Sequence, residues 1–173
     1  MITQGYCRTM ARYNAWQNRS IYTAAAGLTP EAREMDRGAF FGSIRATLSH
    51  LMWADTTWMS RLDGGPGPEA GFSQTAQAYG WVDLVAERPQ LDARITAWAE
   101  QVSDATLAGE LTWYSGMVGR EMRKDFALCV MQIFNHQTHH RGQVHAMLTA
   151  AGAEPEATDL PFIPEQDAVW PLA

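Results

Sequence analysis

The sequence predicts an all-α protein, a four-helix bundle with long elaborated connections and an irregular C-terminal tail. Four long stretches repeat apolar residues every three or four positions, which is the period of a helix with one buried face. Glycine- and proline-rich segments separate these stretches, and no part of the chain shows a convincing sheet pattern. We expect one domain over residues 1–173, with the bundle at about 6–151 and the tail packed against it at 152–173.

Composition narrows the possible partners and location. The formal net charge is −6 and no basic run is present, which argues against nucleic acid as a partner. No apolar stretch reaches the roughly 20 residues that span a bilayer, and the N-terminus lacks the pattern of a signal peptide. The two cysteines, Cys7 and Cys129, give no disulfide framework. We therefore expect a cytoplasmic protein with no membrane partner.

The first helix is expected from Tyr6 to Leu28 and ends before Pro30. Asn14 and Asn18 lie one turn apart near its apolar stripe. Buried amides need hydrogen-bond partners. These two residues therefore either line a polar pocket or, more simply, bond to neighbouring helices or water.

The second helix is expected over about Phe41 to Leu62, with Gly42 or Ser43 at its start. His50 points away from the apolar stripe of this helix, toward a face of small alanine and threonine side chains. Helical phase slightly favours a histidine at the surface or at a second interface. In the alternative interpretation, the small side chains let another helix approach closely and His50 reaches a site there.

Asp55 lies on the apolar face of the same helix, where an unpaired carboxylate would be costly. Three roles remain open for it. It can pair with Arg45 or another arginine, it can cap a backbone group, or it can orient a histidine ring that binds a metal.

The middle of the chain predicts shorter elements. The glycine- and proline-rich run from Asp63 to Pro68 ends the second helix and begins an ordered loop. Trp81 to Glu87 is expected as a short helical piece, and the third long helix as a separate element from Pro89 or Leu91 to Leu107. Glu110 to Lys124 suggests a brief extended stretch with a loop or small hairpin.

The fourth helix is expected to start after Asp125 and to run to about Ala151. Four of the five histidines fall between residues 130 and 148 of it. His136 and His140 lie on its apolar stripe, one turn apart. His139 falls at the edge of the stripe, and His145 is expected to face solvent.

Two inward imidazoles one turn apart are what a metal ion needs from a helix. A shared cation would occupy one nitrogen on each ring at the same time. The alternative is two core histidines, each hydrogen-bonded to a neighbouring group. His136 and His140 by themselves leave both interpretations open, because a metal site needs a third ligand.

The tail carries four prolines and no helical period. Its apolar residues lead us to expect packing along the body of the protein rather than a free end. These residues are Leu160, Phe162, Ile163 and Trp170.

Three stretches together resemble the DinB family of metal-dependent proteins: RYNAWQNR, GSIRATLSHLMWADTTWMSRL and NHQTHHRGQVHAML. The resemblance runs from about Tyr6 to Ala151, and TDLPF in the tail is also typical. The family takes its name from DNA damage-inducible expression. It implies a four-helix bundle, often a homodimer, that holds a divalent metal with three histidines. Carried over by motif, these are His50, His136 and His140, so the role of His50 comes from the resemblance and not from helical phase.

Related members include mycothiol-dependent maleylpyruvate isomerase domains and bacillithiol S-transferases. The resemblance therefore implies a metal-dependent transferase or isomerase that activates a low-molecular-weight thiol against a small-molecule substrate. Three neutral imidazoles leave a coordination position open, as in catalytic metal sites. Asn14, Asn18 and Gln143 are candidates to hold polar substrate groups or water. Imidazole ligands suit several metals, with Zn or Ni expected here.

Two other functions compete with this hypothesis. The spacing of His136 and His140 is that of a zincin HExxH motif, but Gln137 replaces the glutamate and cannot act as a general base. A hydrolase would need another base, for which His139 is the candidate. The protein can also be a non-catalytic metal-binding stress-response protein, since no carboxylate is identified as an acid or base. An ion with four protein ligands would exclude the enzyme.

Overall fold

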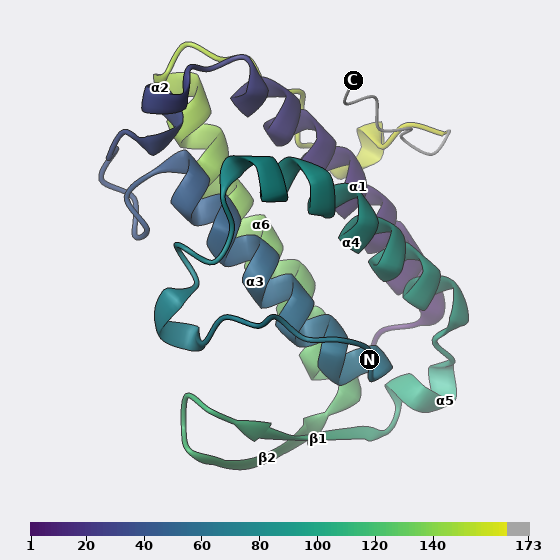
Figure 1. Ribbon diagram of the computed structural model, residues 1–173. Coiled ribbons are helices and arrows are strands. Elements are labelled where there is room, and N and C mark those ends of the chain that lie inside the picture. Colours follow the sequence, from purple (N-terminus) through teal and green to yellow (C-terminus); the bar gives the residue numbers. More distant parts are fainter. Residues whose placement is uncertain (166–173) are drawn as a thin grey trace.

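Four long helices form a bundle in the computed structural model, which describes residues 1–165. α1 packs against α4 and α6, and α3 packs against the same two helices, so that the four enclose one core (Figure 1). The all-α prediction is confirmed. The long helices are α1 (Gln4–Ala26), α3 (Ile44–Asp63), α4 (Trp81–Gln101) and α6 (Phe126–Ala150), and the short ones are α2 (Pro30–Glu34) and α5 (Asp104–Leu107).

Polar side chains mark where α3 begins, and glycine marks where it ends. The Ser43 hydroxyl accepts from the backbone N–H of Ala46, which satisfies a free donor of the first turn. Gly42 precedes it with a φ of 79°, a backbone conformation that favours glycine. Gly64 ends the helix in the left-handed conformation, with a φ of 72°. Ser43, one of the two residues predicted to start this helix, is therefore its cap.

The predicted break before Pro89 is wrong. α4 is one helix from Trp81 to Gln101 with Pro89 inside it, and it bends along its length (Figure 1). Arg88, directly before the proline, forms buried ion pairs that hold this part of the helix against the bundle. The helix also ends before the predicted Leu107, which belongs to the separate helix α5.

A two-stranded antiparallel hairpin of β1 (Glu110–Ser115) and β2 (Arg120–Asp125) lies at the end of the bundle where α6 begins (Figure 1). It occupies the segment in which a loop or small hairpin was expected. One wall of the site described below comes from this hairpin.

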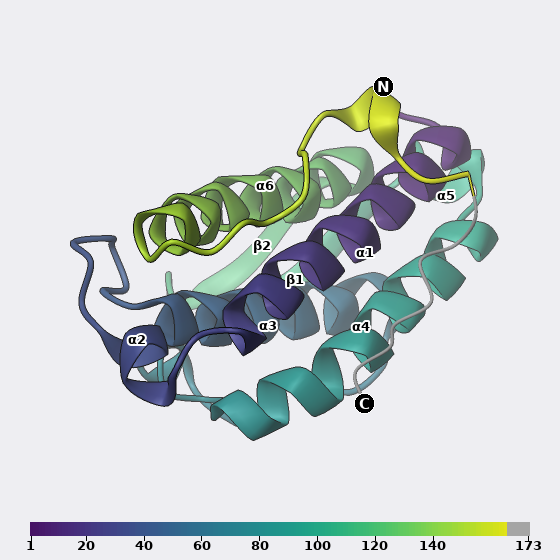
Figure 2. The ribbon, with the colours of Figure 1, turned by 90° about the horizontal axis from the view of Figure 1, so that it is seen from above.

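The described part of the tail, residues 152–165, runs back across α1 and α6 (Figure 2). Hydrogen bonds hold it there. The Tyr13 hydroxyl donates to the carbonyl of Thr158 at 2.7 Å, and the Gln17 amide donates to the carbonyl of Ala157 at 2.8 Å. Leu160 and Phe162, in contrast, remain exposed. Trp170 lies outside the described residues.

No helix within residues 1–165 combines the length and the apolar character that crossing a membrane requires.

Candidate metal centre

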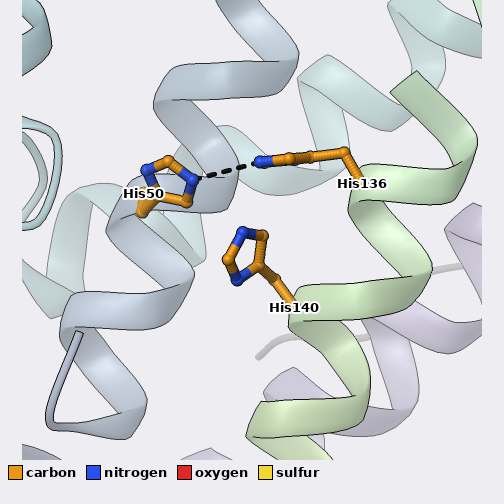
Figure 3. A group of neighbouring side chains, drawn as sticks. All are labelled: His50, His136 and His140. Carbon is orange, nitrogen blue, oxygen red and sulfur yellow. Dashed lines mark hydrogen bonds between the residues drawn. The ribbon is translucent and has the colours of Figure 1, made fainter. Parts of the chain in front are cut away.

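Three histidines meet between α3 and α6 (Figure 3). His50 comes from α3, and His136 and His140 come from successive turns of α6. One ring nitrogen from each lies within 4.8 Å of the other two, and the Nε2 atoms of His50 and His136 are 3.2 Å apart. The structure therefore brings together the three residues that the family resemblance implies, in a cluster that can hold a metal ion.

The surface position that helical phase favoured for His50 is wrong. Its side chain is only 7% exposed and points toward α6. α3 is buried on more than one side, and its small side chains Ala46, Thr47 and Ala54 are all buried. The alternative interpretation holds, because α6 packs against α3 and His50 faces it.

Hydrogen bonds orient two of the three rings. Nδ1 of His140 lies 2.8 Å from Oε1 of Gln143, and because an amide oxygen only accepts, Nδ1 carries the proton. Nδ1 of His50 lies 3.1 Å from the Thr75 hydroxyl. When this nitrogen donates to Thr75, both rings present an unprotonated Nε2 to the centre of the cluster.

The Nε2 atoms of His50 and His136, 3.2 Å apart, form a hydrogen bond when one of them carries a proton, and repel each other when neither does unless a cation lies between them. Tetrahedral zinc, with Zn–N bonds of about 2.0–2.1 Å, places its ligand nitrogens about 3.3 Å apart. The observed separation therefore suits a shared ion.

The electrostatic surroundings keep the rings neutral. Burial, with a further contribution from the neighbouring imidazoles, lowers the pKa of His50 to about 3. Burial likewise lowers the pKa of His140 to about 4 and also lowers the pKa of His136. All three are in the metal-binding form at neutral pH.

A layer of buried polar side chains crosses the bundle next to the cluster. Nη1 of Arg88 donates to Oδ2 of Asp55 at 2.7 Å, and Nη2 donates to Oδ1 of Asp92 at 2.5 Å. The amides of Asn14 and Asn18 also donate to Asp92, at 3.4 and 2.9 Å. The structure thus places the two asparagines in this layer, as partners of a carboxylate from α4.

Asp55 and His136 each retain one unsatisfied buried atom. Oδ1 of Asp55 and Nδ1 of His136 have no hydrogen-bond partner among the described residues. Burial is the main cause of the lowered pKa of His136, and the negative charge of Asp55 opposes it. Asp55 is therefore paired with an arginine, as one prediction held, and its second oxygen remains available to a ring.

The other two histidines of α6 lie outside the cluster. His139 is exposed, with its ring centroid 4.8 Å from that of His140. His145 is half-buried and lines a hollow beneath the tail with Tyr13 and Thr158, so the predicted solvent-facing position is wrong. No pattern in the sequence indicates that the tail covers this face of α6.

Two contributors to the site were missed by sequence reasoning. Thr75 lies in a loop, where no periodic pattern indicates which side chains face inward. Phe41 precedes α3 and stacks on His50, with ring centroids 4.0 Å apart. Phe41 shields the cluster on one side, and a hollow of about 670 Å³ opens beside His50 and His136.

Comparison with known proteins gives two matches. A family model described as the DinB family matches residues 1–168. The chain is 24% identical over 152 residues to "Protein DinB" of Bacillus subtilis (strain 168), which covers 85% of this chain and 87% of that protein. No solved structure matches the chain.

Proposed function

The chain belongs to the DinB family, and on that premise we propose that it binds a divalent metal ion through His50, His136 and His140. We propose further that it is a transferase or isomerase that uses this centre to activate a low-molecular-weight thiol against a small-molecule substrate. The observation that carries the proposal is the convergence of three imidazole nitrogens from two helices within 4.8 Å. Family membership and this cluster both fit a metal-binding protein.

A bound ion, with Zn or Ni proposed, would supply the positive charge that stabilises a thiolate at neutral pH. The residues of the chain prepare the site for it. Thr75 and Gln143 hold His50 and His140 with Nε2 facing inward. Phe41 covers one side, and the adjacent hollow gives a small molecule access to the other. Three ligands leave a coordination position for the thiol.

Asp55 orients His136 in this proposal. Its Oδ2 is held by Arg88, while its Oδ1 and the Nδ1 of His136 are both buried without a partner. A hydrogen bond between these two atoms would satisfy both and would complete a carboxylate–histidine–metal arrangement.

The second candidate is a metal-binding stress-response protein without catalysis. One observation favours it. Asp55, the buried carboxylate beside the cluster, is already paired with Arg88 and is therefore not free to act as an acid or base. A hydrolase has less support. Gln137 stands at the position of the zincin glutamate, but it is 1% exposed and its amide lacks a partner among the described residues. His139, the other candidate base, is exposed.

Elemental analysis of the untagged protein tests the metal site. We expect about one equivalent of metal in the wild type, little in His50→Ala, His136→Ala and His140→Ala, and wild-type content in His145→Ala. If all three variants keep their metal, the assigned ligands are wrong.

Transfer of glutathione, cysteine or bacillithiol to monobromobimane by the metal-loaded protein tests the catalytic part. Acceleration that disappears with the metal supports the enzyme. Full metal loading without acceleration favours the non-catalytic candidate. We also propose a homodimer, from family membership, which sedimentation would test. We propose a cytoplasmic location from the composition of the chain, which cell fractionation would test.

A further inference from the structure

The hollow beside His50 and His136 has walls from four parts of the chain: α3, α6, the hairpin and the loop after Gly64. Within residues 1–165, three tryptophans line it, Trp53 and Trp58 from α3 and Trp113 from β1. Its volume of about 670 Å³ is in the range of small-molecule sites. The hollow therefore combines flat apolar walls with direct access to the three-histidine cluster.

Large apolar side chains are exposed around the same hollow. Phe72, Tyr114 and Met117 are 57%, 70% and 69% exposed, and all three line it. Phe72 comes from the loop before α4, whereas Tyr114 and Met117 come from the hairpin. Apolar side chains gathered around one hollow from two separate segments favour an apolar ligand there.

Among the described residues that line this hollow, Arg61 is the one charged side chain apart from the two neutral histidines. Its guanidinium lies 4.7 Å from the centroid of the Trp58 ring and 5.4 Å from that of Trp113. No carboxylate within residues 1–165 forms an ion pair with it. Arg88 and Arg94, in contrast, both bind carboxylates.

An unpaired, half-buried guanidinium is a natural partner for an anion. It offers planar donors that match a carboxylate, and partial burial strengthens the attraction. Burial also lowers the pKa of Arg61, as expected for a charge partly removed from solvent. The tryptophans on which it stacks hold the group in place.

The spacing along α3 restricts the shape of the ligand. His50 and Arg61 are eleven residues apart, which places them on the same face of the helix with about 16 Å of axial rise between their Cα atoms. Long side chains in helices generally lean toward the N-terminus, which would shorten this distance. A ligand that reaches both groups must still be elongated, and its middle would lie among the tryptophans.

We propose that the hollow binds an elongated organic carboxylate whose carboxylate pairs with Arg61 and whose flat apolar body lies between the tryptophans. The far end of this ligand reaches the three-histidine centre. Only the placement of the ligand's reacting end at the three-histidine centre rests on the proposed function. Recognition of the carboxylate by Arg61 requires no bound ion.

Isothermal titration calorimetry of the full chain with 4-biphenylcarboxylate tests the proposal, with biphenyl-4-carboxamide and benzoate as the neutral and the short probe. We expect the carboxylate to bind at least about 10-fold more tightly than either comparison probe, since a charge-assisted bond is lost in one and apolar contact in the other. Arg61→Met should remove the preference for the carboxylate over the carboxamide. Arg61→Lys should retain part of it.

Arg8→Met is the matched control, because Arg8 lies on α1 in an exposed ion pair with Glu100. It should bind all three probes like the wild type. Circular dichroism and thermal melting establish that each variant is folded. Equal affinity of the wild type for carboxylate and carboxamide would overturn the proposal, as would an unchanged preference in folded Arg61→Met.

Two further measurements accompany the titration. Metal uptake distinguishes failure of this inference from failure of the proposed function, and competition with glutathione distinguishes the possible sources of the carboxylate. Carboxylate binding by a protein that takes up no metal would support this inference and overturn the proposed function. Metal uptake without carboxylate preference would overturn this inference alone. If glutathione displaces the probe from wild type, the carboxylate belongs to the thiol. If both bind together, it belongs to the second substrate. Both results support a carboxylate site.

Discussion

Replacing Thr75 by valine tests whether this residue holds His50 in its metal-binding orientation. Valine keeps the shape of threonine and removes the hydroxyl that lies 3.1 Å from Nδ1 of His50. Thr75 is only 5% exposed, and its carbonyl accepts from the Ser49 hydroxyl at 2.7 Å, so the loop keeps its place after the change. Nδ1 of His50 then loses its partner within a buried environment.

The magnitude follows from what this nitrogen loses. A buried donor left without an acceptor costs about 1–3 kcal/mol. A metal on Nε2 makes Nδ1–H a stronger donor, so most of this loss should appear in the metal-bound state. Removal of such an outer hydrogen bond typically weakens metal affinity by about 10–100-fold. We expect the Kd of Zn²⁺ or Co²⁺ for Thr75→Val to rise by that factor. This corresponds to a binding free energy weaker by about 1.4–2.7 kcal/mol.

Competition with a chromophoric chelator measures the Kd. Thr47→Val is the matched control, because Thr47 is equally buried and its hydroxyl donates to the carbonyl of Ser43 within α3. We expect its Kd to stay within twofold of the wild-type value. A folded Thr75→Val protein that also binds metal like the wild type would refute the reasoning, and would indicate that His50 binds through a different nitrogen.

Two further predictions concern stability in the absence of metal. Arg88→Met should lower the free energy of unfolding in urea by about 3–5 kcal/mol, since it leaves two buried carboxylates unpaired. Arg94→Met breaks a more exposed pair on the same helix and should lower this free energy by at most about 1 kcal/mol. Equal losses in the two variants would contradict the argument from burial. The pKa values of His50 and His140, lowered to about 3 and 4, mean that below pH 6.5 the unfolded chain takes up protons that the folded chain does not. The free energy of unfolding should therefore be insensitive to these groups above pH 7 and fall by up to about 2.7 kcal/mol per pH unit from pH 6 to pH 5. Urea unfolding at pH 5, 6 and 7 checks this against a His50→Ala, His140→Ala double variant, and identical pH dependence in the two proteins would refute it.

The bundle could be predicted from the sequence because its apolar residues repeat with the helical period, which depends only on local spacing. The break in α4 was predicted wrongly because the sequence pattern reports only local preference. Pro89 disfavours a helix locally, whereas the ion pairs of Arg88 with Asp55 and Asp92 are tertiary and leave no trace in the spacing. Propensity indicates the local preference, and buried charge pairing across the core outweighs it here.

The candidate site was only partly predictable. His136 and His140 share one face of one helix, so their spacing alone suggested a metal. His50 sits on a helix that is buried on more than one side, and the direction of the apolar stripe therefore did not indicate which neighbour the histidine faces. Its identification came from the family motif. Thr75 lies in a loop, where inward-facing positions follow no period.

Asp55 connects the candidate site to the bundle as a whole. Its Oδ2 is bound by Arg88, whose other nitrogen reaches Asp92, and Asp92 accepts from two amides of α1. A buried polar layer of this kind is rarely more stable than apolar packing, but it requires that its helices meet in one register. α3 bears both Asp55 and His50, so the same contacts that fix this helix against α4 and α1 also fix the height at which His50 meets α6. The polar layer is best understood as the element that makes three histidines from two helices converge on one point.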